Sequence, residues 1–132
     1  MPHVDLLAVL LCGISSMVLG AIWYAPPLFG KAWQRLTGLS DEALAGGNMA
    51  LIYGGAFLLS LAAAYVFAMF LGPEMGLAGS VAAGAAAGLF WVAAAFGINY
   101  LFERRPLRLW LINGGYHFLQ FTSFGLILGL MA

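Results

Sequence analysis

Four long stretches of this 132-residue chain contain no Asp, Glu, Lys or Arg, and this spacing of the charges limits the fold more than any other feature. The stretches are 6–30, 43–73, 75–102 and 109–132. Each is long enough for the roughly 20 apolar residues that a membrane-crossing helix needs. Only 8% of the residues are charged, whereas a soluble domain carries about 25%. The sequence therefore predicts an integral membrane protein and excludes a soluble enzyme or a disordered tail.

We expect an all-α membrane protein that forms one domain over residues 1–132, with four transmembrane helices arranged as two hairpins. The apolar runs are too long for strands and lack the alternation of polar and apolar residues that strands show. Four helices joined by short loops have to pack as one unit. The predicted spans are 4–24, 48–71, 77–101 and 106–131.

A short amphipathic helix is expected between the first two spans, at residues 28–39. Its apolar residues recur at helical spacing, and Lys31, Gln34 and Arg35 fall between them. Such a helix lies in the membrane interface, with its basic side toward the lipid headgroups. We predict that it anchors the protein there; a binding site for a partner is the alternative. The residues that mark this interfacial motif are Trp23, Tyr24, Pro26, Phe29, Gly30 and Trp33.

The basic residues predict the orientation in the membrane. All five Lys and Arg residues fall in the first and third connections between the spans. The positive-inside rule places these connections in the cytoplasm. We therefore expect a multi-pass protein whose N and C termini both lie outside.

Small residues at four-residue spacing predict close helix contacts, because glycine and serine let helix backbones approach in lipid. We expect these contacts mainly within the chain. We also expect a homo-oligomer, with a dimer favoured, because four helices leave little room for a cavity inside a single chain. A weak internal repeat, Leu-Ile-x-Gly-Gly at 51–55 and 111–115, is consistent with a parallel pseudo-repeat of the two hairpins. The expected packing residues are Ser80, Gly84, Gly88, Gly125 and Gly129.

Three polar residues share one face of the last predicted span: Asn113, His117 and Gln120, which we call the polar stripe. One interpretation is that the stripe lines a cavity or a path for a small neutral solute, with His117 changing charge near neutral pH. The other is that these side chains only join helices by hydrogen bonds. Apart from Asp5 and Arg108 at the outer ends of the first and last spans, no Asp, Glu, Lys or Arg lies within a span, which argues against proton-coupled transport. Further residues expected to line the path are Asn99, Ser15 and Ser16.

Other kinds of chemistry find little support in the sequence. Ser15 or Ser16 with His117 would supply a nucleophile and a base, but no carboxylate in the spans would orient the imidazole, so we expect no enzyme. Cys12 is the only cysteine, and no spacing of ligands indicates a metal site. The sequence also gives no sign of a cofactor. A formal net charge of zero leaves no basic surface for nucleic acid.

The run Trp23-Tyr24-Ala25-Pro26-Pro27-Leu28-Phe29-Gly30-Lys31-Ala32-Trp33 resembles the signature of a bacterial membrane family catalogued as domain of unknown function 1761. The segments 99–103 and 112–117 are similar to later parts of that family, so the resemblance covers nearly the whole chain. Ala25 departs from the small hydroxyl residue that often follows Trp-Tyr. The resemblance implies four membrane helices in a bacterial cytoplasmic membrane, and it brings no activity with it.

Two functions from different classes remain. The first is a small transporter or channel-like protein whose path runs past the polar stripe. The alternative is a non-transporting membrane scaffold or accessory subunit of an envelope complex, which would use the segment 28–39. A stripe that faces water favours the first function, and a stripe in a dry helix contact favours the second.

Overall fold

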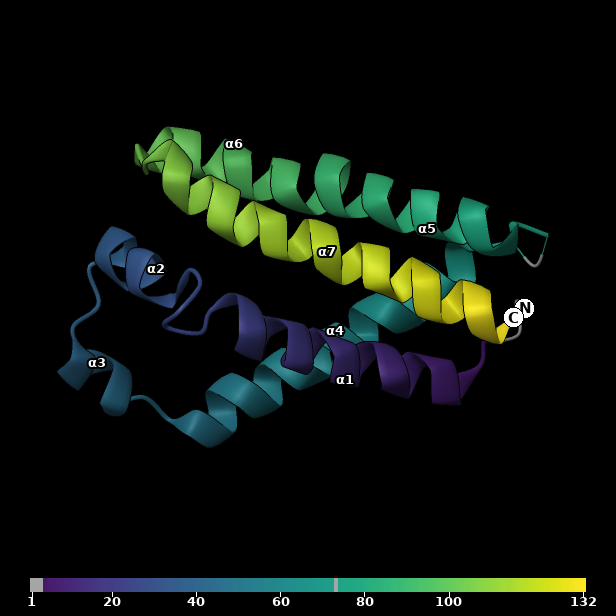
Figure 1. Ribbon diagram of the computed structural model, residues 1–132, viewed down its shortest axis with the longest axis horizontal. Coiled ribbons are helices and arrows are strands. Elements are labelled where there is room, and N and C mark those ends of the chain that lie inside the picture. Colours follow the sequence, from purple (N-terminus) through teal and green to yellow (C-terminus); the bar gives the residue numbers. More distant parts are fainter. Residues whose placement is uncertain (1–3, 73) are drawn as a thin grey trace.

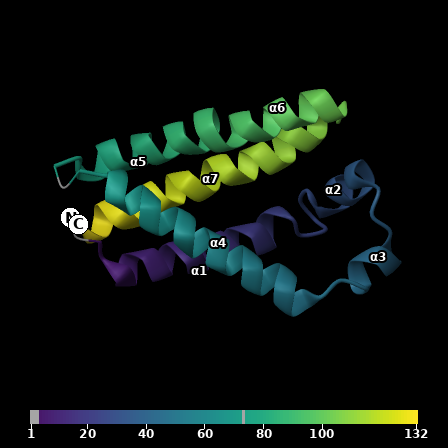
Figure 2. The same ribbon diagram turned by 180° about the vertical axis from the view of Figure 1, so that it is seen from behind.

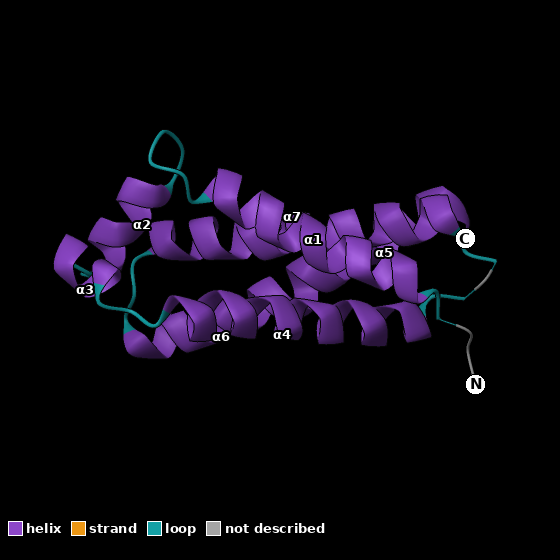
Figure 3. Cartoon of the chain, turned by 90° about the horizontal axis from the view of Figure 1, so that it is seen from below, coloured by secondary structure: helices purple, strands orange, loops and turns teal. Residues whose placement is uncertain are grey.

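The structure is a computed structural model that describes residues 4–72 and 74–132. Within those residues it consists of helices and short loops, without a strand (Figure 1, Figure 3). The expectation of an all-α chain is thus confirmed. The helices are α1 (Leu6–Trp23), α2 (Gly30–Thr37), α3 (Asp41–Ala45), α4 (Met49–Phe70), α5 (Gly76–Ala87), the π-helical turn η1 (Gly88–Ala93), α6 (Ala94–Glu103) and α7 (Leu107–Met131).

Short polar side chains begin α1, α3 and α4 by accepting hydrogen bonds from free backbone N–H groups. The Asp5 carboxylate accepts from the backbone N–H groups of Leu7 and Ala8 at 3.0 and 3.2 Å. Asn48 caps α4 in the same way, and Ser40 caps α3. Gly38 ends α2 in the left-handed conformation, with φ 77°, which glycine adopts without a steric penalty.

The helices form two hairpins that pack on one another (Figure 1, Figure 2). α4 packs on α1, and α7 packs along α5, η1 and α6. α7 also packs on α1, and this contact joins the two hairpins. α2, α3 and the turn between α6 and α7 lie at one end of the bundle, and the C-terminus lies at the other (Figure 1). We call these the basic end and the terminal end, because all five Lys and Arg residues lie in segments at the first.

Three helices in the described part of the chain are long and apolar enough to cross a membrane: Leu6–Trp23, Met49–Phe70 and the continuous helix Gly76–Glu103. The sequence predicted four, and the fourth span, 106–131, is not among them. The physical reason is its polarity, since α7 is 25 residues long but carries Asn113, His117 and Gln120 among its apolar residues. A short helix, α2, forms within the segment 28–39, where one was expected. Its place in the membrane interface stays a prediction.

Glycines let the backbones of α5 and α7 come into direct contact. A Cβ atom on Gly84 would collide with the backbone carbonyl of Phe121, and one on Gly125 with the carbonyl of Ser80. A Cβ on Gly88 would come within 2.7 Å of the His117 carbonyl oxygen. These small residues pack within the chain, helix against helix, as close contact in an apolar solvent requires.

The first half of α4 has few neighbours. Leu51, Tyr53 and Leu59 are 70%, 60% and 74% exposed, and no atom lies within 4 Å of a Cβ built on Gly54 or Gly55. The second half of α4 instead contributes to the buried core. The two matching Leu-Ile-x-Gly-Gly segments therefore differ in their surroundings, because Gly115 in α7 is covered by the ring of Trp23.

Candidate functional site

Gln120 is the centre of a hydrogen-bonded group that joins three helices. Its Nε2 donates to the hydroxyl of Ser16 in α1 at 3.0 Å and lies 3.4 Å from that of Ser60 in α4. Its Oε1 lies 2.7 Å from Nδ1 of His117. Gln120, Ser16 and Ser60 are all buried. A buried amide needs such partners, because an unpaired polar group in an apolar interior is costly.

Asn113 joins the ends of α1, α6 and α7, two turns closer to the basic end. Its Oδ1 accepts from the Tyr24 hydroxyl at 2.6 Å. Its Nδ2 donates to the Tyr100 hydroxyl at 2.8 Å. The amide therefore uses both its acceptor and its donor, and it holds two tyrosines from different hairpins at a single point.

Aromatic rings fill the space between these two groups. His117 is half-buried and stacks on Phe96 of α6, with ring centroids 5.0 Å apart and planes inclined by 15°. Phe96 also contacts Tyr100, at 5.8 Å between centroids. Tyr116 lies edge-on to His117 and donates to the backbone carbonyl of Ser16 at 2.9 Å. The polar stripe thus has an aromatic wall on the α6 side.

Two of the predicted path residues lie outside this arrangement. The Ser15 hydroxyl donates to the Cys12 carbonyl at 2.8 Å and pairs with Ser123 at 3.2 Å. It therefore belongs to the contact between α1 and α7 nearer the terminal end. Asn99 is exposed on α6. Of the predicted path residues, the structure therefore joins His117, Gln120 and Ser16 through the amide of Gln120. Asn113 instead pairs with two tyrosines.

The interfacial motif folds back on the bundle. Trp23 donates from Nε1 to the Ile112 carbonyl at 2.8 Å and lies against Phe29, with centroids 4.6 Å apart. Gly30 allows this turn, because a Cβ atom there would collide with the Tyr24 carbonyl. Trp33 of α2 meets Tyr24 edge-on at 5.9 Å. Pro26, the remaining residue of the motif, is exposed in the loop.

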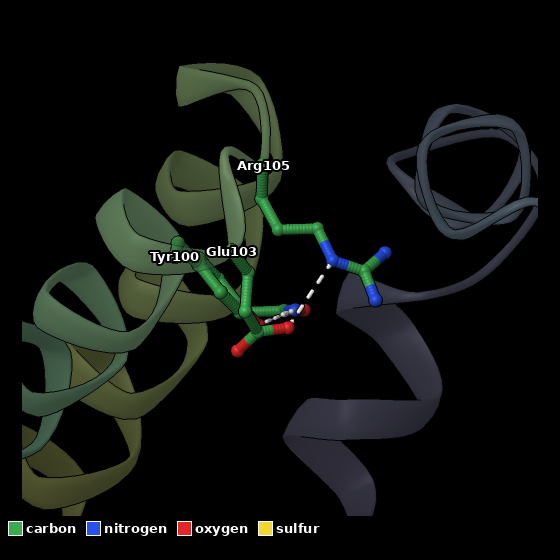
Figure 4. Close-up of polar contacts among 4 residues, drawn as sticks. Tyr100, Glu103 and Arg105 are labelled. Atoms are coloured by element: carbon green, nitrogen blue, oxygen red, sulfur yellow. Dashed lines mark hydrogen bonds and ion pairs between the residues drawn. The ribbon is translucent and has the colours of Figure 1, made fainter.

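A charged pair stands at the basic end beyond Tyr100. Arg105 Nε lies 3.5 Å from Glu103 Oε1. Figure 4 shows both side chains and Tyr100 reaching from the end of α6 and the following turn toward the side where the ribbons of α1 and α2 pass. Both side chains are about half exposed. Such an exposed ion pair contributes little to stability.

The interior toward the terminal end is apolar. Its buried members come from α1, α4, α5 and α7, and Phe124 at the centre is fully buried. The rings of Phe67 and Phe121 meet edge-on at 5.7 Å between centroids. The hydrogen-bonded groups of Asn113 and Gln120 thus lie nearer the basic end. An apolar cluster, which we call the apolar plug, lies toward the terminal end, where Ser80 and the Ser15–Ser123 pair are the polar side chains. The plug comprises Val9, Cys12, Ala64, Phe67, Ala87 and Phe124.

Several contributors to the site carried no sequence signal that we recognised. Tyr116 adjoins the stripe in sequence, and its amphipathic ring would have been a reasonable candidate for a buried hydrogen bond. Trp110 donates from Nε1 to the Ala93 carbonyl at 2.7 Å, where η1 meets α6. Nothing in the sequence indicates that π-helical turn. No group of three or more His, Cys, Asp and Glu side chains suited to a metal ion occurs in residues 4–72 and 74–132.

Comparison with known proteins adds the family but no activity. No curated protein matches the chain, and no solved structure matches it. The family described as "Protein of unknown function (DUF1761)" matches residues 7–129. The motif from Trp23 to Trp33, the polar stripe and the packing glycines all fall within that range. Because the match covers nearly the whole chain, the protein belongs to the DUF1761 family, as the resemblance at residues 23–33 predicted.

Proposed function

We propose that this protein is a small transporter or channel-like protein that carries a small neutral solute past the polar stripe of α7. The observation that carries the proposal is the division of the bundle interior. Polar side chains from α1, α4, α6 and α7 follow one another from Tyr100 to Ser60, and the apolar plug lies beyond them. A solute would enter such a path from the basic end, and the apolar plug would be its barrier.

The proposal needs α7 to cross the membrane as a fourth span. α7 packs along the full length of the helix Gly76–Glu103: Gly129 lies against Leu77, Phe121 against Gly84, and Gly97 against Trp110. A helix that accompanies a membrane-crossing helix from end to end crosses the same distance. Its polar side chains favour this placement because they are paired with other helices rather than turned to lipid.

The proposed setting is a bacterial cytoplasmic membrane with the basic end inside. α2 and the turn between α6 and α7 lie at the same end of the bundle (Figure 1), and they hold Lys31, Arg35 and the Arg residues at 104, 105 and 108. The positive-inside rule then puts the termini outside. α2 lies in the interface, with Lys31 and Arg35 exposed toward anionic headgroups.

Solute flux through the purified protein tests the proposal. Protein in liposomes should let urea or glycerol equilibrate faster than protein-free liposomes do, as measured by stopped-flow light scattering. Ser60→Ala should change that flux because Ser60 contacts Gln120. Ser80→Ala is the matched control, since Ser80 is also a buried serine but lies in the contact of α5 with α7. Flux equal to that of protein-free liposomes for urea, glycerol and benzamide alike would contradict the proposal.

The scaffold function stays as the second candidate, and one observation favours it. In the described part of the chain, no buried side-chain nitrogen or oxygen lacks a hydrogen-bond partner. Fully paired groups are what interhelical joining alone would require. Two results together would fit this function. The protein would carry no solute flux in liposomes, and its removal from the cell would destabilise an envelope complex that it contacts through α2.

Self-association and the absence of catalysis complete the proposal. The bare first half of α4, with Gly54 and Gly55 uncovered, is the face on which we propose that a second copy packs. A particle mass of one chain in several mild detergents would contradict a dimer.

We propose no hydrolase activity, because the hydroxyls of Ser15 and Ser16 pair with Ser123 and Gln120 rather than with His117.

A further inference from the structure

We propose that the hollow between α2 and α3 binds a phospholipid headgroup that carries both a phosphate and a primary ammonium group. The site is separate from the solute path, and the proposal rests on the proposed function only in placing α2 in the membrane interface. It is carried by charges of both signs that line one hollow without pairing with each other.

The hollow lies where the chain turns from α2 into α3, at the basic end of the bundle (Figure 1). Its volume is about 700 Å³. Ligand sites commonly have volumes of about 300–1,000 Å³, so this hollow has room for a headgroup. Lys31, Gln34 and Arg35 line it from α2, and Asp41 lines it from the start of α3.

Lys31 and Arg35 bring positive charge to the α2 side of the hollow. They lie one helical turn apart, which puts them on the same face of α2, and both side chains are exposed. An arginine guanidinium donates two parallel hydrogen bonds to a phosphate, and a lysine ammonium adds a compact charge. These two residues suit the phosphate of any phospholipid.

Asp41 distinguishes among those phospholipids. Gln34 Nε2 donates to Asp41 Oδ1 at 2.7 Å, which holds the carboxylate at the hollow, and Oδ2 makes no hydrogen bond within the described residues. The one ion pair in residues 4–72 and 74–132 joins Arg105 to Glu103, so neither cation of the hollow neutralises Asp41. A headgroup ammonium would donate to this carboxylate, whereas an anionic headgroup without an ammonium would be repelled by it.

A zwitterionic headgroup therefore matches both signs of charge in the hollow. Phosphatidylethanolamine has a phosphate for the two cations and an ammonium for Asp41. Phosphatidylcholine has the same charges, but its nitrogen carries no N–H donor. Phosphatidylglycerol has the phosphate and no ammonium. With identical acyl chains, the three lipids are matched probes of the ammonium group.

Native mass spectrometry tests the inference with the full wild-type chain in a mild detergent and an equal mixture of the three lipids. Bound phosphatidylethanolamine should exceed bound phosphatidylcholine about twofold to fivefold, as expected for one exposed charged contact. Equal binding of these two lipids, or more phosphatidylcholine, would overturn the proposal. Glycerophosphoethanolamine, the soluble headgroup without acyl chains, should not displace the lipid at equal concentration. Displacement would identify a soluble ligand and overturn the lipid as the occupant.

A variant at Asp41 tests the recognition of the ammonium. Asp41→Asn keeps an acceptor for Gln34 and removes the charge, so the ratio of bound phosphatidylethanolamine to phosphatidylglycerol should fall about twofold to fivefold. Glu42→Gln is the matched control, because Glu42 is the neighbouring exposed carboxylate but does not line the hollow. It should keep the wild-type ratio. Equal ratios in the two variants would overturn the proposal.

A variant at Arg35 tests the recognition of the phosphate. Arg35→Gln should weaken the binding of all three lipids, because each of them has the phosphate. Arg104→Gln is the control, since Arg104 is also exposed at the basic end but lies in the turn after α6. Lipid binding that is equal in these two variants would contradict the hollow as the site of the phosphate.

The flux assay separates this inference from the proposed function. A preference for phosphatidylethanolamine without flux of any solute would contradict transport and leave the lipid site standing. Flux of urea without that preference would contradict the lipid site and leave transport standing.

Discussion

At the scale of single residues, the glycines of this chain divide into those that hold helices together and those that touch nothing. Gly84 and Gly125 meet backbone carbonyls of the facing helix, whereas Gly54 has open space around it. Backbone cannot move aside as a side chain can. Sequence spacing alone indicated which glycines share a helix face, but not which of those faces meets another helix.

We expect Gly84→Ala to lower the free energy of unfolding in detergent by about 1–3 kcal/mol, the usual cost of overpacking a tight contact. Gly54→Ala, the same change at the uncovered position, should leave it unchanged or raise it by up to about 1 kcal/mol, because Ala favours a helix interior over Gly. Thermal or denaturant unfolding of the two variants measures the difference. Equal stabilities would mean that α5 and α7 are not as close as the structure places them.

Gln120 offers a second test at this scale, because one side chain serves His117, Ser16 and Ser60. Gln120→Leu keeps the volume roughly constant and leaves two buried hydroxyls without their partner. Interhelical hydrogen bonds in membrane proteins are worth about 0.6 kcal/mol each on average, so we expect a loss of about 1–2 kcal/mol. Asn99→Leu, at an exposed position, is the control, and a loss as large as that of Gln120→Leu would contradict the network.

At the scale of elements, the π-helical turn η1 is where the longest helix departs from regular geometry. Such turns are rare. Trp110 of α7 donates to the Ala93 carbonyl at the end of the turn, with its ring set between Gly97 and Gly114. Because this bond comes from a neighbouring helix, the periodicity of the turn's own sequence could not reveal it.

Trp110→Phe keeps the ring packing and removes the donor, so it should cost about 0.5–1.5 kcal/mol of stability. It should also shift the amide resonances of residues 88–93, as two-dimensional NMR would show. Trp91→Phe is the matched control, because Trp91 lies in the same turn but is 71% exposed. Shifts of equal size in both variants would argue that Trp110 does not support the turn.

At the scale of the whole molecule, the bundle has a basic end and a terminal end, and the proposed topology assigns them to opposite sides of the membrane. Glu74 follows α4 at the terminal end, and Arg104 follows α6 at the basic end. Cys12 is fully buried, so it provides a silent background for cysteine labelling.

In whole cells, a membrane-impermeant maleimide should label Glu74→Cys and leave Arg104→Cys unlabelled until the membrane is disrupted. Both labelling patterns are read by the mass added to the purified protein. The reverse pattern would invert the topology, and labelling of both positions in intact cells would contradict α5, η1 and α6 as one membrane-crossing helix.

The sequence by itself determined the helical class, the approximate bounds of the helices and the segments in which the basic residues gather. It could do so because a backbone in lipid has to satisfy its own hydrogen bonds, which leaves a helix as the form for each long apolar run. The family also followed from local sequence, in the motif from Trp23 to Trp33. The polar stripe was visible for the same reason, since its three residues lie on one helix.

Only the tertiary structure decided which groups meet the stripe. Asn113 pairs with Tyr24 and Tyr100, and Gln120 pairs with Ser16 and Ser60, and every one of these bonds joins two helices. Ser15 and Asn99, equally polar in sequence, lie elsewhere. The rotation and tilt of each helix determine these partners. They are set by close contacts such as those of Gly84 and Gly125, which no single helix contains.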